Sequence, residues 1–179
     1  MVFKKSMLPN EDIISPGIFL PLLNNKELDI LLRMGLEQAL SQISKWDKIS
    51  FSIDLSINLS PSSLFDKNLP KLLKNLLKKY SIAPNRLTLE LLETQSCNQS
   101  LQDKVINEIS NLGIELAMDD LGSGYSSLQR LLNLPFNIIK IDQTLLSKNR
   151  TTPLQTLCLI ETILQIGNDF ECRVAVEGL

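Results

Sequence analysis

The 179-residue chain contains no histidine, and this absence narrows the chemistry that it can perform. Catalytic groups of the Ser-His-Asp and Cys-His kinds are excluded, and the commonest ligand of zinc is missing. Any acid–base work therefore falls to Asp, Glu, Lys or a metal-bound water. A bound metal should be hard and held by oxygen atoms, which favours Mg²⁺ or Mn²⁺.

The chain also has few cysteines, a small net charge and few long apolar runs. The three cysteines, Cys97, Cys158 and Cys172, form no C-x-x-C pair, so we expect a reducing, cytoplasmic location. A net charge of -2 gives no strong field for duplex nucleic acid. We find no run typical of a signal peptide or a membrane span, and we expect no membrane contact within this chain.

Strand-like and helix-like segments alternate along the chain without a long linker. Strands are expected over 50–58, 86–91, 114–119, 137–142 and 173–177, and helices over 25–45, 70–80, 101–112, 126–132 and 153–166. Ser100 is the expected N-cap of the third helix and Gly113 its stop signal. This alternation predicts one α/β domain with a parallel sheet.

A polar residue stands at or near the carboxyl end of each predicted strand. If these faces point inward, the polar groups meet at one rim. Such a rim carries the active site of a (β/α)₈ barrel and the ligand of an open doubly wound sheet, and the residues alone leave both folds open. A lysine inside a short apolar strand needs a carboxylate or phosphate partner, because burying it alone is costly. The five residues are Asn58, Glu90, Asp119, Lys140 and Glu177.

Two adjacent carboxylates, Asp119 and Asp120, follow an apolar segment and precede a glycine-rich turn. They repel each other when both are ionised, and cations relieve that repulsion. Gly122 and Gly124 allow the backbone to pass close to a ligand. The run predicts a metal-dependent site acting on phosphates. The structural alternative is that the two aspartates cap the turn and the next helix.

Simple structural roles also exist for two other candidate positions. Asn58 is also compatible with an Asx-turn that ends its strand. Glu90 and Glu93 are also compatible with the solvated face of a short helix. Five such coincidences at five strand ends are much less expected than one, so we favour the functional interpretation.

These motifs resemble those of the EAL domain family, the phosphodiesterases that hydrolyse cyclic di-GMP. The run DDLGSGYSSL from Asp119 is similar to the family's DDFGTGYSSL, and LPFNIIKID over 134–142 to its LPVDxLKID. Shorter similarities lie at 57–60, 90–94 and 175–178. The resemblance implies a TIM-like (β/α)₈ barrel in which Asn58, Glu90 and Asp119 bind a first metal and Asp119 and Asp120 share a second.

The resemblance also implies roles for residues beyond the metal ligands. Lys140 would hold the attacking water or a phosphate oxygen, and Glu177 would bind metal or remove a proton. Glu93 would steady a loop over the site. The loop with Gly122 and Gly124 would contribute to nucleotide binding.

The N-terminus departs from the family pattern. The glutamate of the Glu-Ala-Leu motif, a metal ligand, would fall at or just before Met1, where this chain reads MVF. The arginine that follows the motif and grips phosphate corresponds to Lys5 or Lys4, which keeps the charge but loses the bidentate fork. We expect an incomplete barrel of about five to six β/α units over 1–179, lacking the family's first strand, the Glu-Ala-Leu motif and the last strand.

The resemblance implies a phosphodiesterase that converts cyclic di-GMP to pGpG with two divalent cations, Mg²⁺ or Mn²⁺, in bacterial second-messenger signalling. The missing glutamate leaves enzymatic activity open, so the alternative is a catalytically inactive EAL domain that binds cyclic di-GMP or another protein. Expected partners are cyclic di-GMP, a second copy that covers the gap in the barrel, and an upstream sensor or GGDEF domain.

Overall fold

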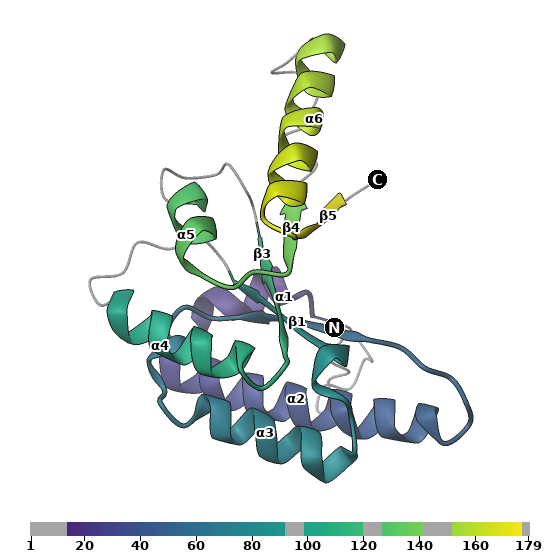
Figure 1. The fold of residues 1–179 in the computed structure, drawn as a ribbon. Helices are drawn as coiled ribbons and strands as arrows, with labels where there is room; N and C mark the ends of the chain where they lie inside the picture. Colours follow the sequence, from purple (N-terminus) through teal and green to yellow (C-terminus); the bar gives the residue numbers. More distant parts are fainter. Residues whose placement is uncertain (1–13, 92–98, 120–126, 142–151, 177–179) are drawn as a thin grey trace.

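The computed structural model describes residues 14–91, 99–119, 127–141 and 152–176. Within them, five parallel strands form one sheet in the order β1-β2-β3-β4-β5, with helices between them (Figure 1). The strands are β1 Leu55–Leu59, β2 Leu87–Leu91, β3 Glu115–Met118, β4 Ile138–Ile141 and β5 Arg173–Val176. The helices are α1 Pro16–Phe19, α2 Asn25–Asp47, α3 Leu69–Tyr80, α4 Gln99–Ser110, α5 Ser127–Asn133 and α6 Pro153–Asp169, with 3₁₀ turns η1 Leu20–Leu22, η2 Ser63–Phe65 and η3 Pro84–Arg86.

The predicted α/β alternation and the parallel sheet are confirmed. Each expected strand and helix is present, with boundaries shifted by a few residues. Strands β1 and β5 each pair with one neighbour among the described strands, so this part of the chain forms an open arc of a barrel.

Two local predictions were wrong. The strand expected over 50–58 begins only at Leu55, because its partner β2 begins at Leu87 and the residues before Leu87 form the turn η3. Ser100 is not an N-cap, since α4 already begins at Gln99 and Ser100 lies in its first turn. Gly113 does follow α4 in a turn, with a φ of +83° that suits glycine.

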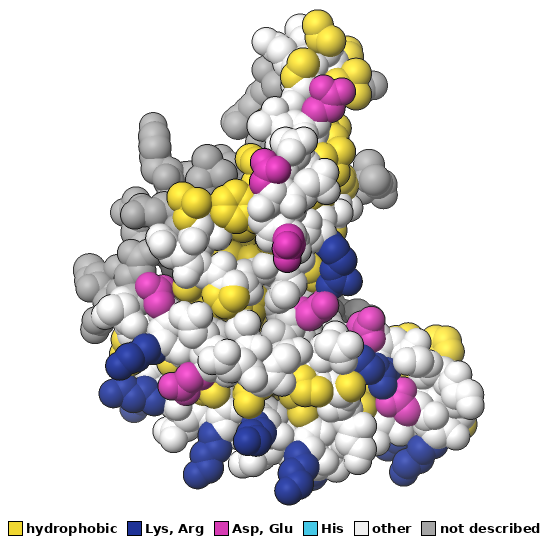
Figure 2. Space-filling model, in the orientation of Figure 1, with side chains coloured by type: hydrophobic (Ala, Val, Ile, Leu, Met, Phe, Trp, Pro, Cys, Tyr) yellow, Lys and Arg dark blue, Asp and Glu magenta, His cyan; other side chains and the backbone are white. Residues whose placement is uncertain are grey.

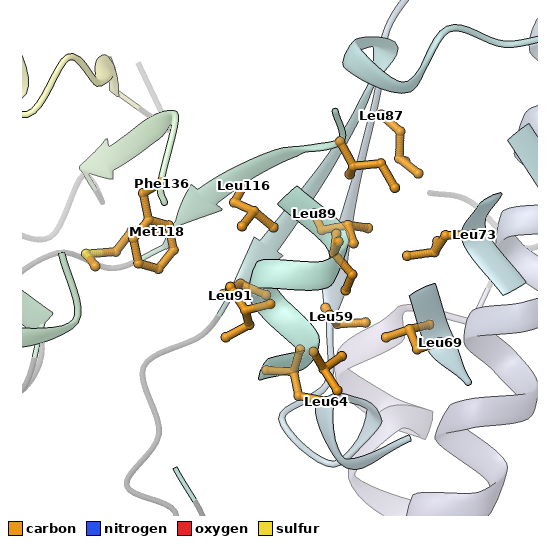
Figure 3. Close-up of a cluster of buried hydrophobic side chains, with 14 of the residues drawn as sticks. Leu59, Leu64, Leu69, Leu73, Leu87, Leu89, Leu91, Leu116, Met118 and Phe136 are labelled. Carbon is orange, nitrogen blue, oxygen red and sulfur yellow. The ribbon is translucent and has the colours of Figure 1, made fainter. Parts of the chain in front are cut away.

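One face of the sheet is apolar and carries the core. Leu87, Leu89 and Leu91 of β2 alternate with polar residues and are buried, as are Leu116 and Met118 of β3. Figure 3 shows these side chains gathered with leucines of α3 and η2. Because side chains alternate along a strand, burying this face turns the polar residues of β2 to the opposite face.

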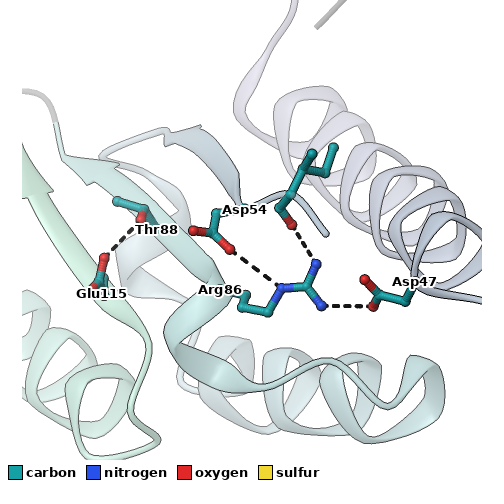
Figure 4. Close-up of polar contacts among 6 residues, drawn as sticks. Asp47, Asp54, Arg86, Thr88 and Glu115 are labelled. Carbon is teal, nitrogen blue, oxygen red and sulfur yellow. Dashed lines mark hydrogen bonds and ion pairs between the residues drawn. The ribbon is translucent and has the colours of Figure 1, made fainter. Parts of the chain in front are cut away.

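The guanidinium of Arg86 binds the irregular segment between α2 and β1 through hydrogen bonds and an ion pair (Figure 4). It donates to the Asp47 carboxylate (Nη1–Oδ2, 2.7 Å) and to the Ile53 carbonyl (Nη2–O, 2.6 Å), and it pairs with Asp54 (Nε–Oδ1, 3.4 Å). The hydrogen bond from Arg86 lowers the pKa of the Asp47 carboxyl group. These contacts hold residues 48–54 beside the start of β2, although none of the described strands pairs with this segment.

Helix α6 projects away from the other helices (Figure 1). Several of its leucines are exposed, and Figure 2 shows hydrophobic side chains on its surface. Among the helices that the structure describes, none combines the length and apolar character that crossing a bilayer would require.

The contact between α6 and β5 depends on Gly167. A Cβ atom at this position would lie 2.6 Å from Val174 Cγ2 and 3.0 Å from the Cys172 carbonyl oxygen. We therefore expect Gly167→Ala to destabilise the protein by about 1–3 kcal/mol through overpacking, despite a gain of up to about 1 kcal/mol in helix propensity. Urea unfolding checks this, with Glu161→Ala on the exposed face of α6 as the control. An unchanged or raised midpoint for Gly167→Ala would contradict the packing argument.

Candidate active site

The second face of the sheet is lined by polar side chains. Ser56 of β1 pairs in register with Thr88 of β2, and Asn58 pairs with Glu90. These four residues share one face because they are spaced by two along each strand. Glu90 in turn lies opposite Ala117 of β3.

Asn58 and Glu90 place two oxygen-bearing groups at the same level on neighbouring strands. Adjacent strands are about 4.8 Å apart, so an amide and a carboxylate on the same face are within reach of one small ion. Asn58 is exposed, whereas Glu90 is buried. Solvent and small ligands can therefore reach Asn58 directly.

Glu90 forms an ion pair with Lys140 of β4. Lys140 Nζ lies 2.9 Å from Glu90 Oε2, and the two side chains are only 12% and 11% exposed. This ion pair confirms the prediction that Lys140 needs an anionic partner, since the Glu90 carboxylate lies within contact distance of its ammonium group. The contact joins two strands that are not neighbours in the sheet, because β3 lies between them.

Ala117 is the residue of β3 at the level of Glu90 on this face. Ala117 stands in register with Glu90 on one side and with Ile138 on the other, and it is buried. Lys140 lies two residues after Ile138 and so shares its face. The side chain of β3 that stands in register with Glu90 is therefore a single methyl group.

Asp119 lies one residue after β3. Its backbone N–H donates to the carbonyl of Leu91 (3.2 Å), which continues the pairing of β2 and β3 beyond the strand. Alternation gives Asp119 the same face as Ala117, and its side chain is half-buried. Asn58, Glu90, Asp119 and Lys140 thus belong to one face, near the carboxyl ends of four successive strands.

The other six candidate residues lie outside the described part of the chain. Across 14–91, 99–119, 127–141 and 152–176, no group of three or more Asp, Glu or Cys side chains is arranged to hold a metal ion. The donors that are described, one amide and two carboxylates, have the oxygen chemistry that Mg²⁺ and Mn²⁺ prefer. The six residues are Lys5, Glu93, Asp120, Gly122, Gly124 and Glu177.

Sequence reasoning missed one residue of this face. The hydroxyl of Ser56 donates a hydrogen bond to Glu90 Oε1. The strand alternation had already put Ser56 on the same face as Asn58, but a serine in a strand gives no further signal. Its partner became visible only with the register of β1 against β2.

Polar pairs also occupy the amino-terminal half of this face. Thr88 Oγ1 donates to Glu115 Oε2 (3.5 Å), and Arg173 forms an ion pair with the same carboxylate. Figure 4 shows the contact between Thr88 and Glu115. The hydroxyl of Thr88 and the guanidinium of Arg173 thus both pair with the Glu115 carboxylate. The groups that we assign to ligand binding lie near the carboxyl ends of the strands.

Comparison with known proteins identifies the family. A family model of the EAL domain matches residues 5–179. The chain therefore belongs to the EAL domain family.

Several relatives carry names that describe their activity. The chain is 31% identical over 175 residues to the cyclic di-GMP phosphodiesterase RocR of Pseudomonas aeruginosa, covering 96% of this chain and 44% of RocR. It is 28% identical to the cyclic di-GMP phosphodiesterase PdeR of Escherichia coli, covering 98% of this chain and 26% of PdeR. The chain thus spans less than half the length of these curated relatives.

Solved structures agree with the fold. The PaMucR phosphodiesterase in complex with c-di-GMP superposes with a TM-score of 0.79 and 26% identity, covering 93% of this chain and 73% of that one. The EAL enzyme Bd1971, in a form with cAMP and cyclic di-GMP bound, gives a TM-score of 0.83 at 22% identity and shares the fold. The open arc therefore corresponds to part of a TIM-barrel-like EAL fold.

The ion pair between Glu90 and Lys140 should show strong energetic coupling. Lys140→Met leaves a buried carboxylate without its ammonium partner, whereas the same change in a Glu90→Gln background does not. We expect a coupling free energy of about 0.5–3 kcal/mol from urea unfolding of the two single variants and the double variant.

The exposed pair of Lys79 and Glu37 provides the matched control for this cycle. Because solvent screens exposed charges, its coupling should be clearly smaller. Equal coupling for the two pairs would contradict the importance of burial at Glu90.

Proposed function

We propose that this chain is an EAL-type phosphodiesterase domain that hydrolyses cyclic di-GMP. One phosphodiester bond would be cut to give linear pGpG, within bacterial second-messenger signalling. Membership of the family and relatives named as cyclic di-GMP phosphodiesterases support this proposal. The observation that carries it is the set of oxygen donors and one lysine on a common face near the carboxyl ends of the strands, where barrel enzymes have their active sites.

We assign the cation ligands by their match to the family pattern. Asn58, Glu90 and Asp119 would hold a first divalent ion, and Asp119 and Asp120 would share a second. Mg²⁺ and Mn²⁺ both suit these oxygen donors. When bound, such ions supply a water of lowered pKa and neutralise charge on the scissile phosphate.

The remaining residues would bind and orient the nucleotide and move protons. Lys140 would orient the attacking water or hold a phosphate oxygen with its ammonium group. Glu177 would bind metal or accept a proton, and Glu93 would steady the loop over the site. Lys5 and the loop with Gly122 and Gly124 would contact the nucleotide.

A second candidate function is a cyclic di-GMP-binding or protein-interaction module without catalysis. The specific observation in its favour is that both oxygens of the Glu90 carboxylate already pair with side chains of the protein, Ser56 and Lys140. Nucleotide affinity through Lys140 and the glycine-rich loop could persist.

One experiment separates these functions. The chain is mixed with cyclic di-GMP and Mn²⁺, and thermal shift and pGpG formation are followed together. Release of pGpG supports the phosphodiesterase, and a shift without product supports the binding module. Absence of both contradicts nucleotide recognition.

Removal of a proposed metal ligand tests the site itself. Asp119→Asn should abolish metal-dependent nucleotide binding and reduce any pGpG formation by at least about 100-fold, since even changes in outer-sphere partners cost 10–100-fold. Asp169→Asn, at the end of α6, is the control of matched chemistry. Unchanged Mn²⁺ affinity in Asp119→Asn would remove Asp119 from the site.

We also propose that the domain works in the cytoplasm, downstream of a sensor or GGDEF domain. We further propose that a second copy of the chain covers the open side of the barrel. Unpaired strand edges favour association, and β1 and β5 are the outer strands of the described sheet. The two described cysteines are free, as a reducing compartment requires. Light scattering at high concentration should give twice the chain's 20.1 kDa, and a monomeric mass would contradict the dimer.

A further inference from the structure

The carboxylate of Glu90 is held from two sides. Its Oε1 accepts a hydrogen bond from the Ser56 hydroxyl on β1, and its Oε2 lies 2.9 Å from Lys140 Nζ on β4. Glu90 itself belongs to β2, between these two strands. Each carboxylate oxygen therefore has a donor, and the two donors approach from opposite directions along the sheet.

Such anchoring matters for a glutamate because its side chain is long. The terminal torsion of a glutamate has a broad energy minimum, so the backbone alone does not fix the direction of the two oxygens. An ion pair with Lys140 alone would draw the carboxylate towards β4. The hydrogen bond from Ser56 draws it in the opposite direction, towards β1 and Asn58.

The position of Ser56 argues against a purely structural role. Ser56 is exposed, so water could satisfy its hydroxyl and nothing forces it to find a protein partner. Glu90 is buried, and a buried carboxylate gains much more from a fixed donor. The hydrogen bond thus serves Glu90 rather than Ser56.

We propose that Ser56 is a positioning residue for Glu90. It fixes the carboxylate in the orientation in which Glu90, together with Asn58, binds a divalent cation. This inference rests on the proposed function, in which Glu90 is a cation ligand. Partners that orient a metal ligand through hydrogen bonds typically contribute 10–100-fold to metal affinity.

Two substitutions at position 56 isolate the hydroxyl group. Ser56→Thr retains the hydroxyl and Ser56→Val replaces it with a methyl group of similar shape, and both residues are favourable in a strand. Ser52→Val, in the exposed segment before β1, controls for an added apolar side chain. Thermal melts without metal verify that all variants fold.

Mn²⁺ affinity is the primary readout, measured without nucleotide from the electron paramagnetic resonance signal of free Mn²⁺. We expect Ser56→Val to weaken Mn²⁺ binding by about 10-fold or more. Ser56→Thr and Ser52→Val should remain within about 3-fold of the wild-type protein, because neither removes the hydroxyl that orients Glu90.

Each other outcome overturns the inference. Equal affinities of the Thr and Val variants show that the hydroxyl plays no part, whether both bind as the wild type does or both bind weakly. If the wild-type chain itself fails to bind Mn²⁺ at a saturable site, the cation ligands of the proposed function are wrong, and the role of Ser56 falls with them. The wild-type titration thus separates the two failures.

Discussion

The ion pair between Glu90 and Lys140 is the interaction on which the polar face of the sheet depends. Both side chains are almost completely removed from water, and each charge would be costly there without the other. A pair of well-packed apolar side chains would serve stability equally well. Stability therefore gives no reason for two charges at this level of the sheet, whereas a site that needs a carboxylate in a fixed orientation does.

One face of the sheet forms the hydrophobic core, and the other carries the polar side chains of the candidate site. Leucines of β2 and the apolar residues of β3 and β4 pack against the helices and hold the strands in parallel order. That packing needs only every second residue of each strand. The alternate positions are then available for Asn58, Glu90 and Lys140, and the parallel arrangement brings their strand ends to one edge.

The sequence predicted most of this architecture because its periodicities are clear. The helix around α3 and the strand around β2 were predicted to within one residue, since a regular apolar pattern fixes both. The start of β1 was wrong because residues 51–54 alternate like a strand but pair with no strand in the described part of the chain. Pairing is a property of two segments, and one segment's pattern does not contain it.

The same limit applies to the candidate site. The sequence indicated that Lys140 needs an anion, because a lysine in an apolar strand is costly, but several carboxylates qualified. The pairing with Glu90 depends on the order and register of β2, β3 and β4, which the pattern of one strand does not contain. The role of Ser56 could not be predicted for a related reason, since it depends on the hydrogen bond that its hydroxyl donates to Glu90.

The crossing of β3 by Lys140 has a consequence for how the sheet assembles. Successive strands are neighbours, so the arc could in principle grow one strand at a time from β1. An intermediate that stops at β3 would leave the Glu90 carboxylate without its ammonium partner, which β4 carries. Docking of β4 is thus tied to the completion of β2, and the link makes the folding transition more cooperative than hydrogen bonding between adjacent strands alone would.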